Sequence, residues 1–212
     1  MDINVAVENL KNGISKVWND TKGRLRPNVF RGHSRAISTD VEDLIGLFVS
    51  DIFDDEFNIL IDSSVHVDTT HRPDMLVVNN GKVVAMIEVK TQMGWCRNAS
   101  GVIDNEIVRM HNIFCETKNL TCKFSNDVDQ QVTYDKDVKL FLIALTSQNG
   151  ANPEQHKKNV EYAKSRDVDH FILFDGWYNS LVNKDINNFA EELIKLKDTS
   201  FTRIDRKNAF CK

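Results

Sequence analysis

Three side chains with complementary chemistry stand in the segment RPDMLVVNNGKVVAMIEVKTQ. Asp74 opens the segment, and after thirteen further residues Glu88 and Lys90 interrupt an otherwise apolar run. Two carboxylates provide the oxygen ligands that Mg²⁺ prefers, and this ion commonly needs only one or two of them besides water and a substrate phosphate. A metal held there polarises a phosphodiester and lowers the pKa of a bound water, while an adjacent ammonium offsets developing negative charge. The segment therefore indicates metal-dependent phosphodiester hydrolysis.

Two paired strands are needed to bring these side chains together. Residues 75–78 and 82–90 have the apolar and β-branched composition of strands, and Asn79-Asn80-Gly81 between them is a strong hairpin signal. Because strand side chains alternate between the two faces of a sheet, we expect three polar residues of the second strand to share one face: Glu88, Lys90 and Gln92.

The register of this hairpin decides whether the metal site can form. A two-residue turn would pair Asn79 with Lys82 and place Asp74 on the face opposite Glu88. A three-residue loop would instead pair Asp74 with Met86 and bring it to the face of Glu88. The sequence therefore predicts the longer loop, or a bulge with the same effect on the face of Asp74.

The remaining pattern predicts an α/β (α+β) fold with a central mixed β-sheet flanked by helices. The expected helices cover residues 3–18, 39–53, 100–114 and 186–196, with another opened by Asn152 and Pro153, and the other expected strands cover residues 57–67, 139–146 and 171–174. The polar stretch 116–137 is expected to be a loop or a small hairpin. We expect a single domain over residues 1–212, with a motif core at about 39–146, a helix and basic arm in 1–38, and a helix-strand-helix in 150–198.

The pattern Pro73-Asp74 followed by Glu88-Val89-Lys90 resembles the motif of the PD-(D/E)XK nuclease superfamily. The core order of that family, a helix, three strands with the motif on the second and third, a helix and a strand, is similar to residues 39–146. The resemblance implies a restriction-endonuclease-like fold, with Asp74 and Glu88 as metal ligands and Lys90 as the catalytic lysine. It also implies Mg²⁺ as the cofactor, with Mn²⁺ able to substitute.

Glu42 is a further catalytic candidate, because members of the family often carry an acidic residue on the helix before the sheet. The run Thr39-Asp40-Val41-Glu42 also fits a capping box, in which Glu42 would reach back to the start of the helix. Both interpretations are open from the sequence.

Charge is segregated along the chain. The formal net charge of −4 argues against nucleic-acid binding by bulk positive charge, yet residues 22–35 hold five basic residues and no acid, whereas residues 40–71 hold nine carboxylates and neither Lys nor Arg. A solvated loop followed by an acidic helix would give the same pattern. The candidates for contact with DNA are Arg24, Arg26, Arg31, Arg35, His71 and Gln92.

The cysteines and the amino-terminal segment place limits on location and on other metal sites. Cys96, Cys115 and Cys122, with His111, lack the C-x2-C spacing typical of zinc sites, and the four cysteines of the chain are expected to be free thiols. No apolar run approaches the length of a membrane span, and the acidic amino-terminal segment does not resemble a signal peptide. We expect a cytoplasmic protein without a membrane contact.

Together these features predict a Mg²⁺-dependent endonuclease that cleaves double-stranded DNA. The resemblance favours a type II restriction enzyme acting as a homodimer. A repair, phage or resolvase-type nuclease of the same fold stays open, because a fold does not determine its substrate. A non-catalytic subunit that binds DNA or a partner protein is the alternative from another class.

Overall fold

The computed structural model describes residues 2–23, 37–53, 57–92, 98–124, 129–147 and 152–209. The strands are β1 Phe57–Ile61, β2 Ser64–His66, β3 Thr70–His71, β4 Met75–Asn79, β5 Lys82–Gln92, β6 Asn119–Lys123, β7 Asp129–Thr133, β8 Lys139–Thr146, β9 Val168–Asp175 and β10 Val182–Asn183. The helices are α1 Ile3–Gly23, α2 Ser38–Phe53, α3 Ser100–Val102, the π-helix η2 Ile103–Val108, α4 Arg109–Thr117, α5 Pro153–Ser165 and α6 Ile186–Ala209.

The ten strands of the described ranges form one mixed sheet. Its main path is β10-β9-β8-β5-β7-β6-β2-β3, and β1 joins through β4, which pairs with β5. Strands β5, β8 and β9 run parallel, so their carboxyl ends meet at one edge of the sheet, whereas β4 is antiparallel to β5. The motif strand β5 therefore lies inside the sheet and ends at the edge where β8 and β9 also end.

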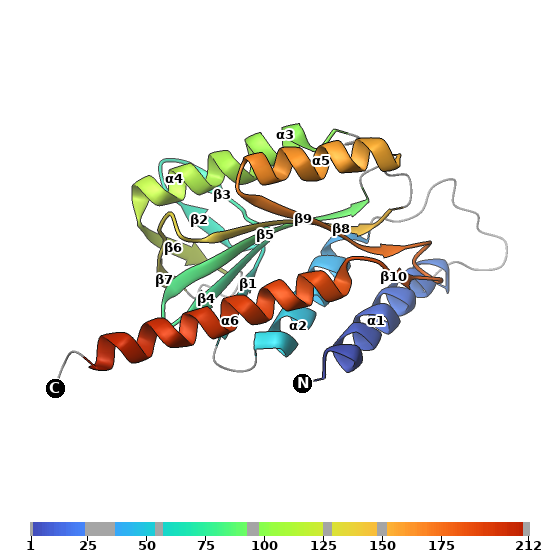
Figure 1. Ribbon diagram of the computed structural model, residues 1–212, viewed down its shortest axis with the longest axis horizontal. Coiled ribbons are helices and arrows are strands. Elements are labelled where there is room, and N and C mark those ends of the chain that lie inside the picture. Colours follow the sequence, from blue (N-terminus) through green and yellow to red (C-terminus); the bar gives the residue numbers. More distant parts are fainter. Residues whose placement is uncertain are drawn as a thin grey trace.

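Helices cover both faces of the sheet, as Figure 1 shows: α1, α2 and α6 lie on one side, and α3, α4 and α5 on the other. On the first face α2 and α6 pack against alternate residues of the central strands, such as Ile87 and Phe141. On the second face the residues between these, such as Met86 and Leu142, form a separate apolar cluster with Ile107. Burying each such side chain contributes about 1.5 to 3 kcal/mol, so the two layers hold the strands in their register. The predicted mixed α/β architecture is confirmed.

The hairpin between β4 and β5 has a tighter turn than the sequence predicted. Asn79 pairs with Lys82, which leaves a two-residue turn, and Asn80 and Gly81 have φ values of 49° and 76°. Positive φ at both central residues is typical of a type I′ turn, whose twist matches that of the flanking strands. The predicted three-residue loop is therefore wrong.

A bulge in β5 restores the face that the site needs. The register shifts within the hairpin and leaves Val84 without a partner in β4. One extra residue in a strand reverses the faces of all residues beyond it. Met75 pairs with Ile87, so Asp74, one residue before β4, lies opposite Glu88. The predicted bulge is confirmed. It moves the partner of Asp74 to Glu88, whereas the expected partner was Met86, and both lie on the same face of β5.

Other elements differ from the prediction in their limits. The expected strand 57–67 is broken into β1 and β2 at Asp62, whose φ of 46° turns the chain so that β1 pairs with β4 and β2 with β6. The polar stretch forms the small hairpin β6 and β7. Asn152 caps α5 by accepting a hydrogen bond of 2.9 Å from the N–H of Gln155, as its position before Pro153 indicated.

The helix after β5 is interrupted by a π-helical segment, which the sequence pattern did not predict. The helix begins at Ser100, as the expected range 100–114 indicated, and Ala99 is its N-cap. Among the helices that the structure describes, none combines the length and the apolar character needed to cross a bilayer.

Candidate active site

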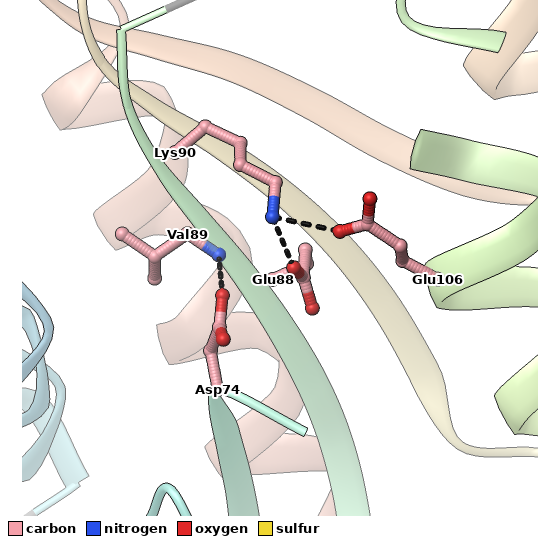
Figure 2. A network of polar contacts seen from close by, with 5 residues as sticks. All are labelled: Asp74, Glu88, Val89, Lys90 and Glu106. Atoms are coloured by element: carbon pink, nitrogen blue, oxygen red, sulfur yellow. Dashed lines mark hydrogen bonds and ion pairs between the residues drawn. The ribbon is translucent and has the colours of Figure 1, made fainter. Parts of the chain in front are cut away.

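Asp74, Glu88 and Lys90 converge at the junction of β4 and β5 (Figure 2). The carboxylate of Asp74 accepts a hydrogen bond of 2.7 Å from the N–H of Val89, the residue between the two others. The Lys90 ammonium donates to Glu88 Oε1 at 2.6 Å and to Glu106 Oε2 at 2.7 Å. Two carboxylates thus contact the Lys90 ammonium, and the Asp74 carboxylate acts on it through its charge.

Burial makes the charge of the two motif carboxyls unfavourable. The Glu88 side chain is 9% exposed, and burial together with the nearby Asp74 carboxylate raises its pKa to about 8. Burial also raises the pKa of Asp74, against the hydrogen bond from Val89 and the charge of Lys90. Two carboxyls held this close repel each other when both are ionised. A cation between them would relieve that repulsion.

Lys90 is held as a cation. Burial alone would lower its pKa, but the Glu88 charge and the hydrogen bonds to Glu106 and Glu88 raise the pKa above its usual value. Its side chain is still 28% exposed, so solvent or a ligand can reach Lys90.

Glu42 lies in the electrostatic field of the same cluster. Burial, followed by the charges of Asp74 and Asp62, raises the pKa of Glu42 to about 7. The helix α2 begins at Ser38, so Thr39 is inside the helix and is not its N-cap. The capping-box interpretation is wrong, and the structure brings Glu42 to the side of Asp74.

The other predicted site residues are placed in different ways. Arg24, Arg26, Arg31 and Arg35 lie outside the described residues. In β3, His71 has its Nε2 3.1 Å from the Thr69 hydroxyl and its ring edge-on to Phe114. Gln92 is the last residue of β5, where its backbone pairs with Thr146 of β8. Contact of these residues with DNA stays a prediction.

Glu106 belongs to the cluster and was not predicted. It comes from η2, on the helix that follows the motif strand, and lies 16 residues beyond Lys90 in the chain. One signal was present in the sequence. Glu106 directly precedes Ile107, an apolar residue of the expected helix 100–114, and a neighbour of a buried position lies close to the edge of the apolar stripe.

The donor set fits a hard divalent cation. Among the residues that the structure describes, no three His, Cys, Asp or Glu side chains are gathered closely enough to hold a metal by themselves. Mg²⁺ does not need such a cage, because one or two carboxylates with water and a substrate phosphate suffice. Asp74 and Glu88 meet that requirement, and their repulsion in the absence of a cation favours the binding of one.

The two cysteines in the described ranges are free, as expected. Cys115 Sγ lies 3.5 Å from His111 Nε2 on the same helix, and burial raises the pKa of the Cys115 thiol. Cys122 is buried in β6. Cys96 and Cys211 lie outside the described residues.

Comparison with known proteins supports the fold at low sequence identity. No family model matches the chain, and no curated protein matches it. Among solved structures the chain is similar in fold to P. aeruginosa ATCC27853 NucC in its cAAA-bound form, with a TM-score of 0.54 and 10% identity. The alignment covers 94% of this chain and 92% of that chain. The restriction-endonuclease-like fold that the sequence motif implied is thereby confirmed.

Proposed function

We propose that this protein is a divalent-metal-dependent endonuclease that hydrolyses DNA phosphodiester bonds. The observation that carries the proposal is the convergence of Asp74, Glu88 and Lys90 on one face at the carboxyl end of β5. An ordinary ion pair between Glu88 and Lys90 would not need a second carboxylate. Here Asp74 lies beside the pair, and partial burial raises its pKa.

In this proposal Asp74 and Glu88 hold the metal. Bound Mg²⁺ would polarise the scissile phosphate and lower the pKa of the attacking water. The Val89 N–H fixes the direction of the Asp74 carboxylate, so this ligand is oriented before any cation arrives. Lys90 donates hydrogen bonds to the phosphate or to the water and offsets the negative charge that develops in the transition state. The half-buried Glu42 adds a third carboxyl whose charge is coupled to that of Asp74.

Digestion of a plasmid by the pure protein with Mg²⁺, with Mn²⁺ and with EDTA tests this proposal. We expect cleavage with either metal and none with EDTA. Lys90→Ala should abolish cleavage, whereas Lys82→Ala, at the other end of β5 and ion-paired with Asp135, is the matched control that should cut normally. Absence of cleavage with both metals, or full activity of Lys90→Ala, would contradict a nuclease function.

Two kinds of nuclease are compatible with the site. Discrete fragments would support the sequence-specific type II restriction enzyme that the motif suggested, with a homodimer to cut both strands. The fold similarity to cAAA-bound NucC extends over nearly the whole chain and favours a second candidate, a nuclease controlled by a small nucleotide. Digestion with and without added cAAA separates the two, since only the second should depend on the nucleotide, and light scattering of the pure protein reports whether it is a dimer.

A non-catalytic subunit that binds DNA or a partner is a weaker candidate, because Asp74, Glu88 and Lys90 are all in place. Titration calorimetry with Mg²⁺ distinguishes it. A scaffold has no reason to bind the ion, whereas the proposed nuclease should bind it and lose that binding in Glu88→Gln.

A further inference from the structure

The Lys90 ammonium has two carboxylate partners of different kinds. Glu88 is buried and, in the proposed function, turns its oxygens to the metal. Glu106 is 46% exposed, comes from another element and is bound to Lys90 at 2.7 Å. If Glu88 binds a metal ion, Glu106 is the carboxylate that remains as a partner for the Lys90 ammonium.

We propose that Glu106 is a positioning residue. It holds the Lys90 ammonium next to the Asp74 and Glu88 carboxyls, and it does so independently of Glu88. The inference rests on the proposed function for its catalytic consequence, but the hold of Glu106 on Lys90 is a property of the protein alone. Lysine has four rotatable side-chain bonds, and a second partner restricts the ammonium to one place.

Glu106 belongs to η2, a π-helical turn whose rotation is set by buried residues. η2 is the one π-helix among the described segments, and such wide turns occur frequently at functional sites. Ile103 and Ile107 are buried in the core below the helix and fix its rotation. With these two residues in the core, Glu106 is directed across the rim of the sheet to β5, as Figure 2 shows.

A second contact anchors the same turn on its other side. Asp104 accepts hydrogen bonds from the Tyr162 hydroxyl at 2.6 Å and from Arg166 Nε at 3.0 Å, both on or next to α5. The two acids of η2 therefore connect β5 on one side with the α5 region on the other. The turn that presents Glu106 is thus also in contact with the α5 region through Asp104.

Substitutions at Glu106 test the role, with Glu116→Gln as the matched control for the same chemical change at an exposed position of α4, which directly follows η2. Glu106→Gln should lower kcat for cleavage of a duplex by about 10-fold to 100-fold, the range typical for outer-shell partners of a metal site, with KM changed less than twofold. Glu106→Asp, which retains the charge, should recover part of the loss. The double variant Lys90→Ala/Glu106→Gln should be no worse than Lys90→Ala alone, because Glu106 acts through Lys90.

A metal-free measurement tests the hold itself. The ¹⁵N–¹H NMR signal of a lysine ammonium is visible when hydrogen bonds slow its exchange with water. We expect this signal for Lys90 in the wild type, in Glu116→Gln and in Glu88→Gln, where Glu106 still binds the ammonium. We expect its loss in the double variant Glu88→Gln/Glu106→Gln, which removes both carboxylate partners.

The outcomes separate this inference from the proposed function. A Lys90 signal that is already lost in Glu88→Gln, or a normal kcat in Glu106→Gln while Lys90→Ala is inactive, would overturn the role of Glu106. A signal that depends on Glu106 in a protein that cuts no DNA would support the positioning of Lys90 and count against the nuclease.

Discussion

The carboxylate of Asp74 lies 2.7 Å from the backbone nitrogen of Val89 and accepts its hydrogen bond. This contact joins the residue before β4 to the residue between Glu88 and Lys90. It sets the position of the first carboxyl relative to the other two side chains through the backbone, which is less mobile than a side chain. The candidate site is thus oriented by a bond that needs no metal.

Two substitutions of Asp74 separate its structural and chemical roles. Asp74→Asn keeps an oxygen for the Val89 N–H but loses the charge, whereas Asp74→Ala leaves that N–H without its acceptor. An unsatisfied buried donor costs about 1 to 3 kcal/mol, so Asp74→Ala should be less stable than Asp74→Asn by that amount in urea unfolding. Both should lose Mg²⁺-dependent cleavage. Equal unfolding free energies of the two variants would show that the hydrogen bond contributes little.

Glu42→Gln should stabilise the protein at pH 8 and not at pH 5. The folded state holds a proton on Glu42 up to about pH 7, above the usual range, so this group contributes stability that is lost as the pH rises from about 4.5 through 7. Glutamine removes that loss. The melting temperatures of both proteins at the two pH values, in EDTA, check the sign.

The neighbouring exposed Asp43→Asn is the control for Glu42→Gln. It removes the same charge one residue away and should change the melting temperature little at either pH. If Asp43→Asn raised stability at pH 8 as much as Glu42→Gln, the effect would come from the overall charge of α2 and not from the position of Glu42 beside Asp74.

We expect the buried His170 to make the folded protein less stable in acid. It is 7% exposed in β9, and its Nδ1 lies 3.0 Å from the Leu142 carbonyl oxygen. Its Nε2 has no hydrogen-bond partner among the described residues, which fits a neutral ring that donates from Nδ1. Burial lowers its pKa, the backbone bond to Leu142 opposes that shift, and His156 on α5 adds to it while Asp185 opposes it. The unfolded chain therefore takes up a proton first, and stability falls as the pH drops below about 6.5.

His170→Asn tests this effect, because its amide can donate to the same carbonyl without titrating. Between pH 7 and 5.5 the wild type should lose up to about 1.4 kcal/mol per pH unit relative to the variant. The exposed His66→Asn is the control. Urea unfolding of the three proteins at both pH values measures the difference, and parallel curves for wild type and His170→Asn would contradict the prediction.

Two glycines with positive φ should differ in their tolerance of alanine. Gly81, with φ 76°, has open space around it, so Gly81→Ala should cost about 1 to 2 kcal/mol of unfolding free energy from the backbone conformation alone. At Gly176, with φ 91°, a Cβ would also collide with the Ser180 carbonyl oxygen. Gly176→Ala should therefore destabilise more. Equal losses of unfolding free energy in the two variants would show that the backbone at Ser180 can move away from the added Cβ at little cost.

Local sequence patterns predicted much of the architecture. The apolar run 139–146, the cap at Asn152 and the hairpin before Lys82 each depend on interactions between near neighbours, and all three were found. The break of the expected strand at Asp62 was not predicted. Its two halves, β1 and β2, pair with different strands, β4 and β6, and that choice of partners is not visible in the local sequence.

At the site, local patterns in the sequence establish the residue types and, through strand alternation, the common face of Glu88 and Lys90. The positions of Asp74 and Glu106 depend on contacts between distant parts of the chain. The bulge at Val84 brings Asp74 to that face, and packing of the helix around Ile107 aims Glu106 at Lys90. Alternation is a local property of the chain, whereas strand register and helix rotation follow from which distant apolar surfaces pack together.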